Sequence, residues 1–254
     1  MYWGSVKTFT QVYPKLSFLK RLTQSGPRKD HLSGVPAAIM STSAKTSRTG
    51  GKFGKRIIWI DLELTGLEQD AKILEIACLV TDPDLEVLDE GVECIVHQPD
   101  DVLNSMNAWC VEHHGKSGLT EACRKSTMSL EQAEQKVLKF VEALTPFGKC
   151  PIAGSSVHTD REYIRRLMPK FNEHCSYRII DVSSIKEICR RWYPGIFSRC
   201  PTKKLSHRSL DDILESIEEL KYYRQNIFVN EVERNARKEQ EQTMNSESGG
   251  DALK

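Results

Sequence analysis

The stretch RIIWIDLELTG, from Arg56 to Gly66, contains an apolar run about as long as a β-strand and rich in β-branched and aromatic residues. This composition predicts a central strand covered on both faces. Asp61 and Glu63 interrupt the run at positions i and i+2. Because side chains alternate across a strand, the two carboxylates project from the same face. We therefore expect a cation between them, since unneutralised like charges repel and lose hydration.

Paired carboxylates at this spacing favour Mg²⁺ or Mn²⁺, which prefer oxygen ligands. The same pattern also suits two solvated acids at the point where a strand leaves a sheet. Asp61 and Glu63 alone do not decide between these interpretations. The metal hypothesis requires further ligands elsewhere in the chain.

The net charge of the 254 residues is +1, but the charge is unevenly distributed. Residues 1–55 contain ten Lys or Arg and one acid, Asp30, a charge of +9, which leaves −8 for the remainder. This balance argues against a broad basic face as the main nucleic-acid contact in the body of the protein. Capture of phosphate through a metal remains open.

The eight cysteines are scattered, without Cys-x-x-Cys pairs or zinc-finger spacing. Several lie in apolar runs, which predicts reduced thiols in the core rather than disulfides. No apolar stretch approaches the length of a transmembrane helix, so we expect no membrane partner.

Three regions are distinguished by composition. Residues 1–54 are basic, rich in Ser and Thr and nearly free of acids, which is typical of a mitochondrial presequence and linker; a disordered basic tail is the alternative. Met40 could start a shorter form for the cytoplasm or nucleus, alongside the form in the mitochondrial matrix. Residues 55–228 form the predicted domain, and residues 229–254 a polar, disordered tail.

The pattern of elements predicts an α/β fold with a mixed five-stranded sheet flanked by helices. Short links predict an antiparallel meander of three strands, within 56–66 and at 73–81 and 92–97. Helical periodicity and strand-like runs alternate afterwards. The expected helices span 102–109, 129–144, 159–168, 183–193 and 209–228, with a loop at 113–118 and strands at 151–156 and 178–182.

Asp160 lies at the start of an apolar stripe in one of these helices, followed by apolar or aromatic residues at 163, 164, 167 and 168. A carboxylate on a core-facing stripe requires a partner. It can be a metal ligand, or an acid that the helix dipole favours in the first turn. Both interpretations stay open for this residue taken alone.

The segment from Ser206 to Asp212 marks the start of the final helix. Counting around that helix places Asp211 nearly opposite the apolar face and Asp212 at its edge, so Asp212 is better placed to reach inward. Ser209 and Asp212 could instead form a pair resembling a capping box. His207 precedes the helix, and its intrinsic pKa suits a general base near neutral pH.

Asp61, Glu63, Asp160, His207 and Asp212 are together the parts of a two-metal phosphodiester hydrolase. With its surrounding motifs, this set resembles the DEDDh branch of the RNase H-like 3′→5′ exonucleases, and within it the oligoribonucleases. The resemblance covers about residues 56 to 228. Its motifs are Trp59 to Leu67, Ser105 to Trp109, His114 to Leu119, Tyr177 to Ser183, and His207 to Asp212.

The resemblance implies an RNase H-like exonuclease fold and a metal-dependent 3′→5′ exoribonuclease. Its substrate would be very short single-stranded RNA, especially dinucleotides, which it hydrolyses to 5′-mononucleotides. Asp61, Glu63, Asp160 and Asp212 would hold two Mg²⁺ or Mn²⁺ ions. His207 would be the general base on the attacking water.

The resemblance also implies substrate-binding residues. Leu67 would act as a wedge and Trp109 would stack on a base, which suits sequence-tolerant binding. Tyr177 would come from the partner subunit of a homodimer with composite active sites. Taken alone, Trp109 is more often a core or interface aromatic.

A site for the substrate's 5′ phosphate is implied at Ser156, Arg178 and Ser183, and a guanidinium with two hydroxyls is chemically suited to phosphate. Such a cap explains a preference for dinucleotides, because a longer strand would have no exit. Arg178 could equally pair with a neighbouring acid, and Ser183 could cap the following helix.

The chain departs from the family pattern at two positions. Ser155 stands where the family usually has Asn, which removes an amide that could support the site, and Leu64 stands where Met is frequent. Rival interpretations are a DEDDh exonuclease acting on longer RNA or DNA, a catalytically silent RNA-binding module, and a homodimeric scaffold. The intact set of five catalytic positions disfavours the silent module. A scaffold gives no reason for the inward-facing Asp61, Glu63 and Asp160.

Overall fold

The computed structural model describes residues 53–202 and 208–228. Residues 1–52, 203–207 and 229–254 lie outside this part of the chain. The presequence, the second start at Met40, the C-terminal tail and the general base His207 therefore remain predictions.

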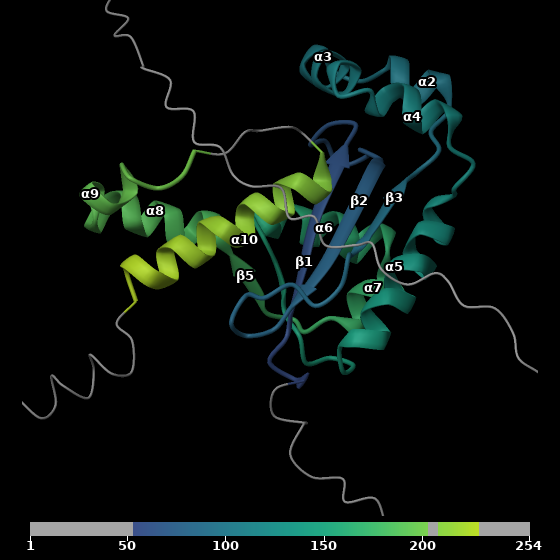
Figure 1. Cartoon of the computed structure of the whole chain (residues 1–254). Helices are drawn as coiled ribbons and strands as arrows, with labels where there is room; N and C mark the ends of the chain where they lie inside the picture. The colour runs from purple at the N-terminus through teal and green to yellow at the C-terminus, as the bar shows by residue number, and fades with distance from the viewer. Residues whose placement is uncertain (1–52, 203–207, 229–254) are drawn as a thin grey trace, which may run out of the picture. The chain divides into compact units, whose positions relative to one another are not determined.

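Five strands form one mixed sheet in the order β3-β2-β1-β4-β5 (Figure 1). Strand β1 (Ile57–Leu64) pairs antiparallel with β2 (Ile73–Thr81), and β2 pairs antiparallel with β3 (Val92–Ile95). Strand β4 (Ile152–Gly154) runs parallel to β1, and β5 (Ile179–Asp181) runs parallel to β4. The predicted meander and five-stranded mixed sheet are both confirmed.

Helices cover both faces of this sheet. One face is covered by α5 (Leu130–Leu144), α6 (Val157–Leu167) and α7 (Pro169–His174). The other is covered by α8 (Val182–Trp192) and α10 (Ser209–Asn226), and Figure 1 shows α10 crossing the strands diagonally. The shorter helices are α2 (Asp100–Asn104), α3 (Ala108–Lys116), α4 (Leu119–Lys125) and α9 (Pro194–Phe197).

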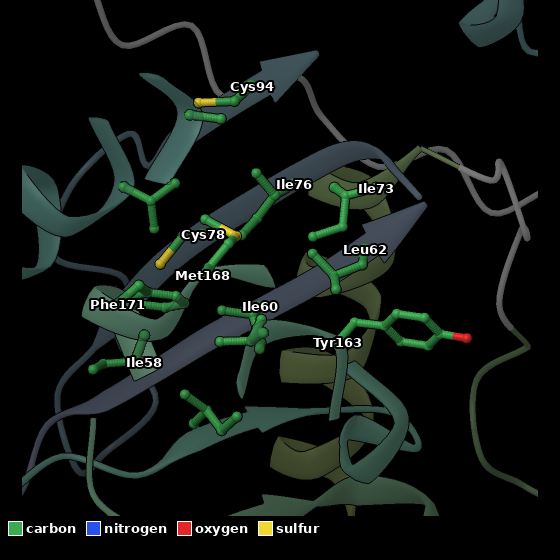
Figure 2. Packing of buried hydrophobic residues seen from close by; sticks show 14 of the residues in the cluster. Ile58, Ile60, Leu62, Ile73, Ile76, Cys78, Cys94, Tyr163, Met168 and Phe171 are labelled. Carbon is green, nitrogen blue, oxygen red and sulfur yellow. The ribbon is translucent and has the colours of Figure 1, made fainter. Parts of the chain in front are cut away.

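The alternation along β1 places apolar side chains in both layers of the core. Ile58, Ile60 and Leu62 face α6 and α7, as Figure 2 shows with Met168 and Phe171 packed beside them. The intervening residues on β1 face α10 instead. Each fully buried aliphatic side chain contributes about 1.5–3 kcal/mol relative to an exposed one. The strand is thus held from both sides up to the point where its acids begin.

The region between β3 and α5 differs from the prediction. The helix predicted over 102–109 is two helices, because Asn107 begins α3 by accepting a hydrogen bond from the Cys110 backbone N–H at 2.9 Å. The loop predicted at 113–118 was wrong, since α3 continues to Lys116. The chain turns only at Gly118, whose φ of 79° is left-handed. Helices α4, α7 and α9 were not predicted.

Other expectations agree with the structure more closely. Helix α5 begins after Ser129, which forms a capping box with Gln132 as its sequence suggests. All eight cysteines are free thiols, and seven are buried. Among the described helices, none combines the length and apolar character needed to cross a bilayer.

Candidate active site

Asp61 and Glu63 lie at the end of β1 and meet Asp212 from the first turn of α10. One carboxylate oxygen from each of the three lies within 4.8 Å of the other two. All three side chains are half-buried. Asp211, by contrast, is exposed, so the prediction that Asp212 is the inward acid is confirmed. The capping-box alternative is wrong for this helix, because Arg208 is its N-cap and no side chain caps it.

Asp160 reaches the same strand from α6. Its Oδ1 accepts a hydrogen bond from the Leu62 backbone N–H at 3.0 Å, between the two acids of β1. This position is open because β4 ends at Gly154, where a Cβ would lie only 2.7 Å from the Ile60 carbonyl oxygen. Only glycine allows so close an approach, and the chain then turns into α6. The structure therefore places all four predicted carboxylates at one end of β1.

The environment of Glu63 and Asp160 disfavours their charged forms. Burial raises the pKa of Glu63 from 4.5 to about 7, with further contributions from the charges of Asp212, Glu75 and Asp160. Burial also raises the pKa of Asp160 from 3.8 to about 7, against the opposing effect of its backbone hydrogen bonds. A divalent cation would neutralise this repulsion. Several oxygen donors on neighbouring elements suit Mg²⁺ or Mn²⁺.

Ser155, the departure from the family pattern, makes a contact that supports this site. Its hydroxyl lies 2.9 Å from the hydroxyl of Ser216, which in turn donates to the Asp212 carbonyl oxygen at 2.8 Å. The two serines thus connect the end of β4 to the first turn of α10. Ser155 therefore makes a side-chain contact of its own next to the acidic cluster.

A pocket of about 410 Å³ adjoins the acids, lined by Glu63, Leu67 and Trp109 among others. Leu67 and Trp109 are exposed by 77% and 53%, so the core interpretation of Trp109 is wrong. The Trp109 ring stacks on His113, with ring centroids 4.0 Å apart. An apolar pocket with exposed stacking surface beside acidic side chains can hold a planar base next to a phosphate group.

His114 is a residue of this pocket that the sequence reasoning did not assign to the site. It is buried, its Nε2 lies 3.0 Å from the Leu64 carbonyl oxygen, and its Nδ1 lies 3.8 Å from a Glu63 carboxylate oxygen. The imidazole therefore connects α3 to the end of β1. The adjacent pair His113 and His114 was visible in the sequence, but not which ring turns inward.

Ser156 and Ser183 come together at the far end of β5 from Arg178. The Ser156 hydroxyl donates to the Ser183 hydroxyl at 3.1 Å. Asp181, not anticipated from the sequence, accepts from the backbone N–H groups of both serines at 2.9 Å. Asp181 also caps α8, so the alternative that Ser183 is the cap is wrong.

Arg178 and Tyr177 precede β5 and are both exposed. The Arg178 guanidinium lies over the Tyr177 ring, 4.7 Å from its centroid. This is the geometry of a cation–π contact between two exposed side chains. The guanidinium is thus accessible to a phosphate group.

Comparisons with known proteins agree with this geometry. The family model for exonucleases (RNase T) matches residues 58–220. The mitochondrial oligoribonuclease of Bos taurus is 52% identical over 215 residues, covering 82% of this chain and 91% of the relative, and that of Homo sapiens is 51% identical with the same coverage.

A solved structure supports the fold alone. The zinc-bound form of Escherichia coli exonuclease I in complex with single-stranded DNA aligns with a TM-score of 0.54 at 16% identity. The alignment covers 68% of this chain but only 41% of exonuclease I. The predicted RNase H-like fold is confirmed.

Proposed function

This chain belongs to the oligoribonuclease family of exonucleases, and we propose that it is a metal-dependent 3′→5′ exoribonuclease that hydrolyses very short RNA, especially dinucleotides, to 5′-mononucleotides. The main observation behind the proposal is the convergence of Asp61, Glu63 and Asp212 within 4.8 Å, with Asp160 bound to the same strand. Such a set is expected to hold divalent cations next to a phosphodiester.

We assign Asp61, Glu63, Asp160 and Asp212 as ligands of two Mg²⁺ or Mn²⁺ ions. When bound, these cations would neutralise the nonbridging phosphate oxygens and lower the pKa of water. The four carboxylates would hold the cations from two positions on β1, one on α6 and one on α10. His207, which lies before α10 in the sequence, is the proposed base that takes the proton of the attacking water.

The pocket formed by Leu67 and Trp109 is the proposed site for the bases. Leu67 would separate the two bases while Trp109 stacks on one of them. Stacking is tolerant of sequence because every base has a flat face. The position of Glu63 in the lining of this pocket would bring the scissile phosphate to the metal ligands.

The proposed site for the 5′ phosphate consists of Ser156, Ser183 and Arg178. These residues would close the substrate site behind the second nucleotide. The contact between the two serine hydroxyls supports the serine part of this assignment. The exposed Arg178 guanidinium would reach the phosphate from the opposite end of β5. Tyr177, exposed by 78%, is proposed to complete the site of the other subunit in a homodimer. Light scattering should give the mass of a dimer, and Tyr177→Ala should raise KM for the dinucleotide. A fully active monomer would contradict the composite site.

Residues 55–228 are the proposed exonuclease domain, preceded by a mitochondrial presequence over 1–54 and followed by a tail over 229–254. The enzyme would act in the mitochondrial matrix, with a form starting near Met40 in the cytoplasm or nucleus. N-terminal sequencing of the protein from each compartment tests both statements. Absence of any species beginning near Met40 would remove the shorter form.

The activity is tested with a 5′-labelled tetraribonucleotide. The proposal predicts stepwise shortening from the 3′ end with release of 5′-mononucleotides, slower than for a dinucleotide because of the closed 5′ phosphate site, and arrested by EDTA. Asp61→Asn, purified in the same way, is the matched control for a contaminating nuclease. Internal cleavage, or turnover that persists in EDTA and in Asp61→Asn, would overturn the assignment.

A further inference from the structure

Glu75 is a fifth carboxylate beside the four proposed metal ligands. It lies in β2 directly opposite Glu63, in the register of the antiparallel pair, and is fully buried. A buried carboxylate is costly unless it is paired and hydrogen-bonded. Its placement next to an acidic cluster therefore requires a specific partner.

That partner is the beginning of α10. The Arg208 guanidinium donates to Glu75 from Nη2 at 2.9 Å and from Nε at 3.4 Å. The Ser209 backbone N–H, at the first position of the helix, donates to Glu75 Oε2 at 3.2 Å. Arg208 Nη2 also lies 3.4 Å from Glu93 Oε1 on β3. Two strands of the meander thus hold the residue that begins the helix.

From these contacts, and on the basis of the proposed function, we propose that Glu75 and Arg208 are positioning residues that fix the first turn of α10 against β2 and so hold Asp212 in the metal-binding cluster. The Arg208 carbonyl oxygen accepts from the Asp212 backbone N–H at 3.1 Å, so the two residues lie one helical turn apart. A displacement of Arg208 would therefore move Asp212 directly.

The charges of the pair have opposite effects on the cluster. Glu75 raises the pKa of Glu63, whereas Arg208 lowers it. The two charges therefore oppose each other at Glu63. The contacts of the pair with the start of α10 indicate a geometric contribution, as for residues behind metal ligands in general, whose loss weakens metal affinity or activity by about 10–100-fold.

Arg208→Lys and Arg208→Gln separate geometry from charge. Arg208→Lys keeps the charge but loses the two-point contact, because an ammonium cannot reproduce the guanidinium fork. In Arg208→Gln the positive charge is removed near four acids, so a pure field effect would tighten cation binding. Positioning predicts that both variants bind more weakly.

The measurement is Mn²⁺ affinity by calorimetry on the full chain, with kcat and KM for a dinucleotide alongside. We expect Arg208→Lys to bind Mn²⁺ about 10-fold more weakly or worse and to have a lower kcat, with KM nearly unchanged. The control is Arg224→Lys on the same helix, whose guanidinium pairs with the exposed Asp84 and should leave both quantities at the wild-type value.

Circular dichroism decides whether Arg208→Gln is folded; if it is not, Arg208→Lys alone decides. Wild-type Mn²⁺ affinity and kcat in Arg208→Lys, or tighter Mn²⁺ binding in folded Arg208→Gln, would overturn the proposal. Since Mn²⁺ affinity is measured without RNA, wild-type protein that binds Mn²⁺ but does not hydrolyse RNA would contradict the proposed function while leaving the test of positioning intact.

Discussion

The Asp160 carboxylate accepts a hydrogen bond from the Leu62 backbone N–H at 3.0 Å, although the two residues are 98 positions apart in the sequence. The bond ties the first turns of α6 to β1 between Asp61 and Glu63. The carboxylate is buried, and this burial raises its pKa. Asp160 therefore has two separate roles: its negative charge would bind the proposed metal, and its oxygen accepts the backbone hydrogen bond from Leu62.

Asp160→Asn and Asp160→Ala should separate these roles. The Asn variant retains an oxygen acceptor for Leu62 and removes a charge that burial disfavours, so metal-free protein near neutral pH should be at least as stable as wild type. The Ala variant leaves the Leu62 N–H without its acceptor, at a cost of about 1–3 kcal/mol. Urea unfolding in EDTA measures both.

Both Asp160 variants should lack RNA hydrolysis, because each lacks a proposed ligand. The combination of preserved stability and lost turnover in Asp160→Asn is the informative result. Near-normal turnover in that variant would exclude Asp160 as a ligand.

Asp211 and Asp212 are adjacent acids of opposite exposure and provide a matched pair. Asp212→Asn should lower kcat by about 100-fold or more, since a metal contributes several kcal/mol to such reactions. Asp211→Asn should stay within about twofold of wild type, as surface substitutions usually do. Equal losses in the two variants would contradict the geometry of the cluster.

Stabilisation by divalent cations should increase with pH. The pKa of Glu63 is raised from 4.5 to about 7 in the folded, metal-free protein. Between these values the folded state binds protons more tightly than the unfolded chain, so this contribution to stability is lost as pH rises through that window. Bound metal favours the ionised carboxylate and offsets the loss.

The rise in melting temperature on adding Mg²⁺ should therefore be larger at about pH 8 than at about pH 5.5. Glu63→Gln should reduce the difference, because one of the two carboxyl groups whose pKa is raised to about 7, Glu63 and Asp160, is then gone. A rise that is the same at both pH values in wild type would contradict this account of the acidic cluster.

Sequence patterns predicted the sheet well because alternation and short turns are local signals. The inward turn of Asp212 could be predicted from helical spacing, and it agrees with the structure. The Asp160 bond to Leu62 could not, since it depends on β4 ending at Gly154. The contact of Ser155 with Ser216 could not be predicted either, because the two residues are 61 positions apart in the sequence. It connects the end of β4 to α10.

Two other misses have physical causes. Gly115 suggested a loop, yet glycine is tolerated in the last turn of α3, and the turn is made at Gly118, whose φ is positive. Glu75 was visible as a single acid inside an apolar strand. Its partner Arg208 is 133 positions away, so the pair could be identified only from the fold.

Arg178 provides a test of the proposed 5′ phosphate site. Arg178→Ala should lower kcat/KM about 10- to 100-fold on a 5′-phosphorylated dinucleotide. This fold-change corresponds to the free energy of one charge-assisted hydrogen bond. The loss should be smaller on longer strands. Arg191→Ala, an exposed arginine paired with Glu187 on α8, is the control. Equal losses on both substrates in Arg178→Ala would argue against the phosphate cap.

The most direct test of the central claim compares a 5′-phosphorylated diribonucleotide with a seven-residue RNA, using protein that starts near residue 50, in Mg²⁺, Mn²⁺ or EDTA. The account predicts fast, metal-dependent hydrolysis of the dinucleotide and slow attack on the longer strand. Faster cleavage of the longer RNA would retain the exonuclease chemistry but contradict the capped site. No cleavage of either substrate in Mg²⁺ or Mn²⁺ would contradict the enzyme and favour a silent RNA-binding module.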